Sequence, residues 1–148
     1  MTLHSQIYTS CIWKQPSIAR EILRNFPTLD PLAILFNSKV YFVKEENSII
    51  SFVTVKKFFK TYELGTAYTY PKFRKKGYIS DMVSHVLEKY DQLSLLCKPN
   101  LVSFCKELGF YECSQCDMII NIRRTLYNLF LAPLTGSTIT SMKYKRTT

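Results

Sequence analysis

The chain has 148 residues, of which 47% are hydrophobic and 14% aromatic, so it can bury the core of one ordinary domain. Aromatic residues are plentiful and glycine is scarce, with 10 Tyr, 10 Phe and 4 Gly, which argues against a disordered or repeat protein. The formal net charge of +9 indicates an anionic ligand or partner. Charge alone does not distinguish a phosphorylated cofactor from a nucleic acid or a membrane surface.

The five cysteines are odd in number and scattered, at positions 11, 97, 105, 113 and 116. Residues 1–5 lack the basic start and apolar run of a secretory signal, and no stretch approaches the length that crosses a bilayer. We therefore expect free thiols in a reducing, cytoplasmic setting, with no membrane partner. Cys113 and Cys116 have the spacing of a metal knuckle, but no second cysteine pair or nearby histidine accompanies them, so no metal site is predicted.

The N-terminal quarter predicts two short helical segments. Residues 17–25 form an amphipathic pattern with Ser17 as the N-cap. Pro27 and Pro31 interrupt the chain before a second short turn of helix at residues 32–36.

From Lys39 the hydrophobic period changes to that of strands. Residues 40–45 and 49–55 predict an antiparallel hairpin around a turn at residues 46–48. The basic run 56–60 is expected to leave the sheet as a solvated loop, and residues 62–70 predict a third strand that Pro71 ends.

The second half opens with the most regular helical pattern, which begins at Gly77. Its apolar stripe consists of Ile79, Met82, Val83, Val86, Leu87 and Tyr90. Residues 93–97 predict a buried strand, and residues 99–108 a short helix capped by Gly109. Residues 110–122 predict a long strand, followed by a helix at 125–131 and a polar, basic tail. The order indicates a single α/β domain over residues 1–148, without repeats or a linker.

The junction between the third strand and the long helix, residues 71–80, carries the clearest functional pattern. A helix that begins just after a strand presents free N–H groups and the positive end of its dipole, and both favour a phosphate. Gly77 allows close backbone approach, and the cations Arg74, Lys75 and Lys76 precede it. A solvated basic turn that merely starts a helix remains the alternative.

These residues in their context resemble the GNAT superfamily of acyl-CoA N-acyltransferases. The family's loop pattern is Gln/Arg-x-x-Gly-x-Gly/Ala, which Arg74 and Gly77 match and from which Ile79 departs. The family often ends its later helix with Leu-Gly-Phe, which residues 108–110 match. The resemblance covers about residues 38–120 and implies a mixed, mostly antiparallel central sheet flanked by helices. That sheet would be splayed at the cofactor site, between the strands that end near Tyr70 and Cys97.

The resemblance also implies how the chain binds acetyl-CoA as co-substrate. The strand end at residues 68–70 would pair with the pantetheine arm, and backbone N–H groups from about residue 75 to 80 would hold the pyrophosphate. Asn100 either reaches the cofactor, as in the family, or serves as a cap or turn residue after Pro99. The implied cofactor residues are Tyr68, Thr69, Tyr70, Arg74, Lys75, Lys76, Gly77, Tyr78, Ile79, Ser80 and Asn100.

Two side chains are candidates for proton transfer. Glu63 lies six residues before Thr69 on the same face of the strand, where some GNAT enzymes have a catalytic glutamate; a solvated strand-start glutamate is the alternative. Cys105 stands where the family has its general acid, a Tyr, so it is either a thiol acid or a small buried residue. Tyr111 and Tyr68 are alternative acids.

The implied activity is transfer of an acetyl group from acetyl-CoA to a primary amine, directly in a ternary complex. The alternatives are a catalytically inactive GNAT-fold protein that binds acyl-CoA, and a basic RNA-binding module without a cofactor. Expected partners are an amine-bearing acceptor, either a small molecule or a protein, a second copy in a homodimer and, as a minor option, RNA.

Overall fold

The computed structural model describes residues 6–26 and 29–147, so the expected break at Pro27 lies outside the described residues. The chain folds into two compact units. Unit 1 comprises Met1–Lys56 and Gly65–Val86, and unit 2 comprises Lys57–Leu64 and Leu87–Thr148. No helix of the described residues is long and apolar enough to cross a membrane.

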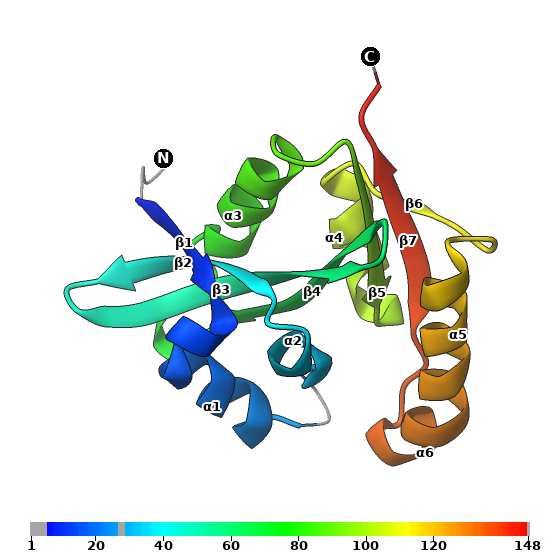
Figure 1. Ribbon diagram of the computed structural model, residues 1–148, viewed down its shortest axis with the longest axis horizontal. Coiled ribbons are helices and arrows are strands. Elements are labelled where there is room, and N and C mark those ends of the chain that lie inside the picture. Colours follow the sequence, from blue (N-terminus) through cyan, green and yellow to red (C-terminus); the bar gives the residue numbers. More distant parts are fainter. Residues whose placement is uncertain (1–5, 27–28, 148) are drawn as a thin grey trace. The chain divides into compact units, whose positions relative to one another are not determined.

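Seven strands are hydrogen-bonded in the order β1-β2-β3-β4-β5-β7-β6 (Figure 1). The pairings of β1 with β2, β2 with β3, β5 with β7 and β6 with β7 are antiparallel, whereas β4 and β5 run parallel where Glu63 and Leu64 face Ser94 and Leu95. The predicted mixed, mostly antiparallel sheet is therefore confirmed. The strands are β1 (Ile7–Cys11), β2 (Lys39–Glu45), β3 (Ser48–Phe58), β4 (Thr61–Thr69), β5 (Gln92–Cys97), β6 (Tyr111–Glu112) and β7 (Thr140–Lys145).

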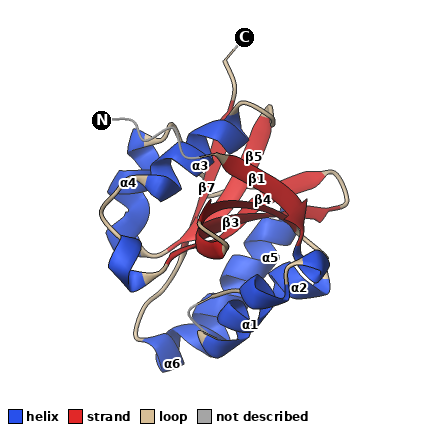
Figure 2. Ribbon diagram, turned by 90° about the vertical axis from the view of Figure 1, so that its left-hand side faces the viewer, coloured by secondary structure: helices blue, strands red, loops and turns tan. Residues whose placement is uncertain are grey.

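Helices cover both faces of the strands in each unit. In unit 1, α1 and α2 lie on one face and α3 on the other, and in unit 2 α4 and α5 flank β5 and β7 (Figures 1 and 2). The helices are α1 (Pro16–Arg24), α2 (Leu32–Leu35), α3 (Tyr78–Leu87), α4 (Val102–Glu107), α5 (Met118–Leu126) and α6 (Ala132–Thr135). The predicted flanking of the sheet by helices is thereby confirmed.

The core of unit 1 joins its first helices to its strands. The apolar stripe of α1 buries Ile18 and Ile22, as the period of residues 17–25 predicted. They pack with Ile12, Leu29, Ala33, Val40, Phe42 and Phe52.

Two predictions for the N-terminal half are wrong. Ser17 is not an N-cap, because α1 begins at Pro16, whose fixed φ suits the first helical position, and follows Gln15 without a side-chain cap. The run 56–60 does not leave the sheet, because β3 continues to Phe58 and Lys56 is completely buried. An ion pair with Asp30 makes this buried charge tolerable.

The prediction of a long strand at residues 110–122 is also wrong. Only β6, Tyr111–Glu112, is extended, and α5 begins at Met118. The run of branched residues there has the composition of a strand, but backbone N–H groups of Ile120 and Asn121 bond to the carbonyl of Asp117 and start a helix. The basic tail forms β7, which β5 and β6 flank, so its order comes from pairing rather than from its own sequence.

The elements around the junction at residues 71–80 agree with the prediction. The strand at residues 62–70 is β4 (Thr61–Thr69), and the helix after Gly77 is α3, although it ends at Leu87, before Tyr90. The short helix after Pro99 is α4, which follows a 3-10 turn at Pro99–Leu101. Gly109 has φ +94°, as its predicted role in ending this helix requires.

Candidate functional site

The end of β4 is held by hydrogen bonds to β3 within unit 1. The Ser51 hydroxyl donates to the carbonyl of Tyr68 at 3.2 Å and lies 2.8 Å from the Thr69 hydroxyl. The N–H of Tyr70 donates to the carbonyl of Ile50 at 3.0 Å. This N–H is therefore engaged within the protein, and the pantetheine pairing implied for residues 68–70 would need other backbone groups.

The two tyrosines at this strand end face a buried acid of α1. The rings of Tyr68 and Tyr70 meet edge to face at a centroid distance of 5.3 Å. Burial, followed by the charge and hydrogen bonding of Glu21, raises the pKa of both phenols. Both phenols therefore hydrogen-bond to the Glu21 carboxylate.

Arg74 folds back on this strand end. Its Nε donates to the carbonyl of Thr69 at 3.0 Å, and its guanidinium lies 5.8 Å from the centroid of the Tyr68 ring. The residue is exposed, although its side chain also hydrogen-bonds to Tyr68. Arg74 thus ties the loop to β4 and presents a cation at the same place.

Two of the loop lysines gather around Phe73. Phe73 is buried in the 3-10 turn Pro71–Phe73, and the ammonium groups of Lys72 and Lys76 lie 4.6 and 5.6 Å from its ring centroid. Cations over an aromatic face are held without being neutralised by an acid. The loop therefore keeps its positive charge near the start of α3.

The backbone between Arg74 and α3 contains two left-handed residues. Lys75 and Gly77 have φ values of +62° and +81°, a conformation that occurs in many backbone anion sites. The first helical backbone bond runs from the N–H of Asp81 to the carbonyl of Gly77 at 3.1 Å, so the N–H groups of residues 78–80 precede it. A side chain at Gly77 would point into open space, as expected where a ligand approaches the backbone.

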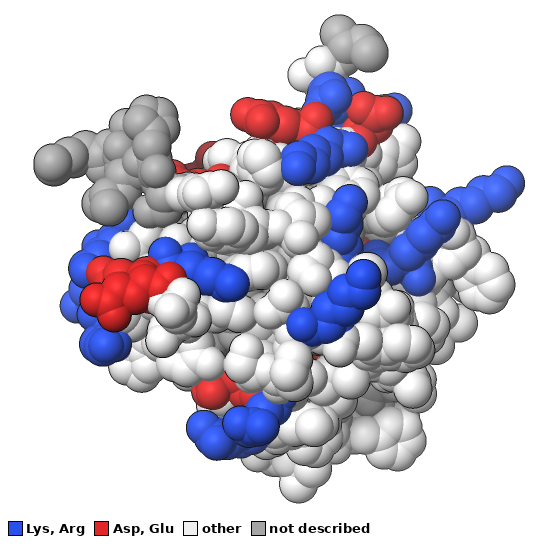
Figure 3. All heavy atoms as spheres, turned by 60° about the vertical axis from the view of Figure 1, so that its left-hand side comes forward, with Lys and Arg blue, Asp and Glu red and all other residues white. Residues whose placement is uncertain are grey.

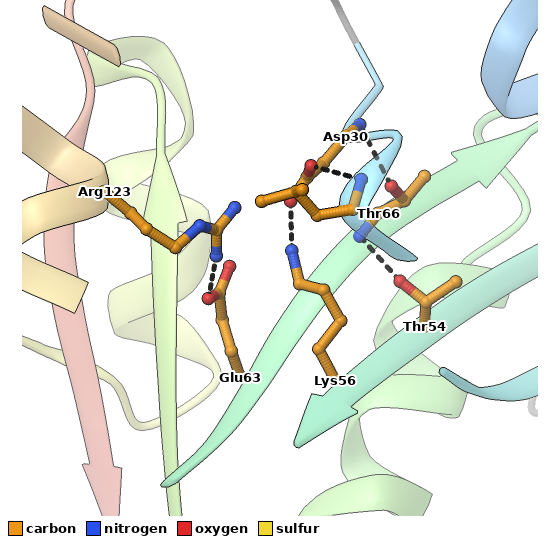
Figure 4. Close-up of polar contacts among 7 residues, drawn as sticks. Asp30, Thr54, Lys56, Glu63, Thr66 and Arg123 are labelled. Carbon is orange, nitrogen blue, oxygen red and sulfur yellow. Dashed lines mark hydrogen bonds and ion pairs between the residues drawn. The ribbon is translucent and has the colours of Figure 1, made fainter. Parts of the chain in front are cut away.

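Glu63, the predicted base, is buried rather than solvated. Only 2% of its side chain is exposed, and it forms an ion pair with Arg123 of α5 (Figure 4). Both residues belong to unit 2. The Glu63 carboxylate would therefore have to part from the Arg123 guanidinium before it could take a proton from a substrate.

A second buried ion pair lies within unit 1 and was not predicted. Lys56 of β3 pairs with Asp30, whose N–H is 3.3 Å from the Thr66 hydroxyl (Figure 4). The N–H of Thr66 donates to the Thr54 hydroxyl at 2.9 Å. In the sequence, the sign of this ion pair was Lys56 near the end of an apolar strand. Nothing in the sequence indicated its partner Asp30, which lies 26 residues earlier.

Cys105, the predicted thiol acid, is buried in α4 and hydrogen-bonds to Cys97 of β5. This hydrogen bond lowers the pKa of Cys105, against the opposing effect of burial, and raises that of Cys97. The sulfur of Met142, 3.4 Å from the Cys97 sulfur, is a second acceptor within reach of the same thiol proton. Cys105 is therefore buried, as the alternative of a small buried residue expected, and it belongs to a pair of thiols.

The remaining candidates are placed plainly by the structure. Asn100 and Tyr111 are exposed, on the 3-10 turn after β5 and on β6. Outside the candidate set, His85 of α3 is half-buried and meets the Tyr41 ring edge-on, at 6.1 Å between ring centroids. The five cysteines are free thiols, and no group of three or more metal-ligating side chains occurs among residues 6–26 and 29–147.

Unit 2 also contains an open cleft of about 460 Å³. Lys60, Lys89 and Lys143 line it beside Tyr62 and Tyr90, whose rings lie 4.9 Å apart. The carboxylates of Asp91 and Asp117 also line it and offset part of this charge. Figure 3 likewise shows basic side chains at separate places on one face, several of them beside acids.

The structure therefore groups the predicted residues by unit. Residues 68–70 and 74–80 belong to unit 1, and Glu63, Asn100 and Cys105 belong to unit 2. Sequence reasoning missed Glu21, Asp30, Lys56 and Arg123, because each acts through a partner that is distant along the chain.

Solved structures show the fold of this chain in known acetyltransferases. A GNAT family acetyltransferase from Elizabethkingia anophelis with acetyl-CoA bound has a TM-score of 0.71 at 13% identity, covering 98% of this chain and 100% of that one. The ribosomal-protein-S18-alanine N-acetyltransferase from Escherichia coli gives 0.65 at 11% identity, covering 97% and 96%.

N-acetylglutamate synthase from Neisseria gonorrhoeae, complexed with coenzyme A and N-acetyl-glutamate, has a TM-score of 0.70 at 16% identity. The match covers 98% of this chain, which spans only 36% of the synthase. No curated protein sequence matches the chain significantly. The model of the Acetyltransferase (GNAT) family matches residues 7–110, more than half of the sequence. The chain belongs to the GNAT acetyltransferase family.

Proposed function

We propose that this chain is an N-acetyltransferase that moves an acetyl group from acetyl-CoA to a primary amine by direct transfer in a ternary complex. The observation that carries the proposal is the backbone of residues 74–80. Two left-handed residues, Lys75 and Gly77, precede the start of α3 in a loop with four cations and without an acid. This arrangement suits a pyrophosphate better than it suits a carboxylate or a neutral ligand.

Both backbone groups and side chains would bind the cofactor. The N–H groups of residues 75–80 would hold the pyrophosphate, and Arg74, Lys75 and Lys76 would add charge-assisted contacts. Because Arg74 is anchored to Thr69, its cation is preorganised and loses little side-chain entropy on binding. Asn100 remains a proposed contact to the cofactor.

The transfer step requires a neutral amine, an oxyanion donor and an acid for the leaving thiolate. We assign the base role to Glu63, whose carboxylate would take the amine proton as its contact with Arg123 loosens. The backbone near Thr69 would donate to the oxyanion, and the Cys105 thiol would protonate the sulfur of coenzyme A. The amine nitrogen then gains the acetyl group, and coenzyme A leaves as a thiol.

An acyl-CoA-binding protein without transferase activity is the second candidate. The ion pair of Glu63 with Arg123 favours it, because a guanidinium in place would block proton acceptance. The cysteine at position 105, where the family has a tyrosine, favours it too.

Isothermal titration with acetyl-CoA and with CoA tests the binding site. We expect Gly77→Glu to weaken both affinities by at least tenfold, because its side chain would enter the space in front of α3 with a negative charge. Gly136→Glu is a matched control, since Gly136 also has positive φ, +68°, and open space, but lies beyond α6. Equal affinities for Gly77→Glu and Gly136→Glu would show that this loop does not hold the cofactor.

A thiol-release assay with a panel of primary amines tests the transfer. We expect Glu63→Gln to lower kcat by at least tenfold while leaving the affinity for acetyl-CoA unchanged. Binding of acetyl-CoA without thiol release from any amine would support the second candidate. Full turnover by Glu63→Gln would exclude Glu63 as the base.

A further inference from the structure

The helical segment between β6 and β7 carries a row of large apolar side chains in solvent. It runs from α5 through a π-turn at Tyr127–Leu131 into α6, all within unit 2 (Figure 1). We call this row the apolar stripe. Its members, with their exposed fractions, are Met118 (78%), Ile122 (46%), Leu126 (50%), Leu129 (64%), Phe130 (62%) and Leu134 (77%).

The opposite face of the same segment packs against the rest of unit 2 and hydrogen-bonds to it. Ile120 is completely buried, and Arg124 donates to the Ser141 hydroxyl at 2.8 Å. The side-chain amide of Asn128 bonds to both the N–H and the carbonyl of Ile139, at 2.8 and 3.2 Å. These contacts fix the rotation of the segment, so its outward face is not free to turn inward.

The π-turn keeps the stripe on one side. Most members are spaced by four residues, and each such step in a regular α-helix turns the side chain by about 40°. Over the four steps from Met118 to Leu134 the stripe would drift by about 160°. The wider turn at Tyr127–Leu131 takes more residues per turn, so the angle between successive residues is smaller there and the drift of the stripe is reduced.

From this geometry we infer that the apolar stripe is the contact face of a homodimer, in which the segment packs against the same segment of a second copy. The two faces would meet about a two-fold axis, and each stripe would supply the surface that the other covers.

The area of the stripe suits this partner. If one fully exposed side chain of this size presents roughly 170 Å², the six present on the order of 600 Å². That equals the largest patch usual on a monomer, about 600 Å². Two such faces remove on the order of 1,200 Å², where specific, stable interfaces begin.

The charges point to a second copy rather than to lipid. The chain carries a net +9, so two copies repel wherever cations meet, yet residues 125–142 contain no Asp, Glu, Lys or Arg. A membrane-surface helix has a polar face rich in free cations. Here Arg123 and Arg124 of α5 are instead held by Glu63 and Ser141.

Sedimentation velocity across the micromolar range tests the inference. We expect the wild type to sediment as a dimer, and a Leu126→Glu/Phe130→Glu variant to dissociate at least tenfold more readily with an unchanged circular-dichroism spectrum. Leu35→Glu is the matched control, because Leu35 is an apolar residue of α2 with 70% exposure and should leave the dimer intact.

Three outcomes would overturn the inference. They are a wild type that stays monomeric, a stripe variant that still dimerises like the wild type, and a monomer that co-sediments with phosphatidylcholine vesicles through the stripe. If the double glutamate variant does not fold, Leu126→Gln serves in its place, with the same expected rise in the dissociation constant. None of these results depends on acetyl transfer.

Discussion

The Asp30–Lys56 ion pair of unit 1 allows a specific prediction about stability, because its two members differ in burial. The side chain of Lys56 is 0% exposed and that of Asp30 is 27% exposed. In Asp30→Asn the buried ammonium loses its carboxylate, which costs about 3–5 kcal/mol of unfolding free energy. In Lys56→Met the charge left behind is the carboxylate of Asp30, which is partly exposed and so partly solvated by water.

Asp30 also keeps a partner in that second variant, since its carboxylate accepts the N–H of Leu32 at 2.9 Å. Methionine fills a volume similar to that of lysine, so we expect Lys56→Met to cost only about 1 kcal/mol. The difference between the two single variants, roughly 2–4 kcal/mol, is the quantity to measure.

Urea unfolding followed by far-ultraviolet circular dichroism provides the measurement. Since a chain of this length loses about 2–4 °C per kcal/mol, Asp30→Asn should also melt roughly 6–20 °C lower. The double variant Asp30→Asn/Lys56→Met should recover most of the loss, because no buried charge remains. Equal losses in the two single variants, or a larger loss in Lys56→Met, would refute the reasoning from burial.

Three further predictions follow from the same structure. The Glu63–Arg123 pair has the opposite asymmetry, with exposures of 2% and 15%, so Arg123→Met should cost more stability than Glu63→Gln in the same urea assay. Gly65→Ala should cost about 1–3 kcal/mol, because its Cβ would lie 2.7 Å from the Thr54 hydroxyl and 3.2 Å from Lys56 Cε; stability equal to the wild type would show that both yield freely. Burial raises the pKa of the Cys116 thiol from 9.0 to about 12. A raised pKa stabilises the protonated folded state, so unfolding free energy should fall from about pH 9 toward pH 12, and less steeply in Cys116→Ala, as measured by urea titrations at several pH values.

The position of the loop at residues 71–80 between a strand and a helix could be predicted from the sequence, because the residues that determine it are neighbours along the chain. Gly77 was expected to allow a close approach of the backbone to a ligand or a sharp turn, and its φ of +81° is one that glycine adopts at little cost. The left-handed conformation of Lys75, at φ +62°, was not expected, since non-glycine residues adopt it rarely.

By itself, the sequence determined the elements whose period is strong and local. The hairpin of β2 and β3, the strand β4 and the helix α3 lie where their alternating or helical patterns placed them. Gly109 ends α4 with a positive φ that a glycine adopts at little cost.

Only the tertiary structure decided the elements that depend on distant partners. β7 is ordered because β5 and β6 pair with it, and the segment 110–122 becomes helical from Met118 although its branched residues favour a strand. Lys56 and Glu63 are buried because Asp30 and Arg123 neutralise them, from 26 and 60 residues away along the chain. Pairing and charge compensation over such separations leave no periodic trace in the sequence, so they emerge only when the chain is folded.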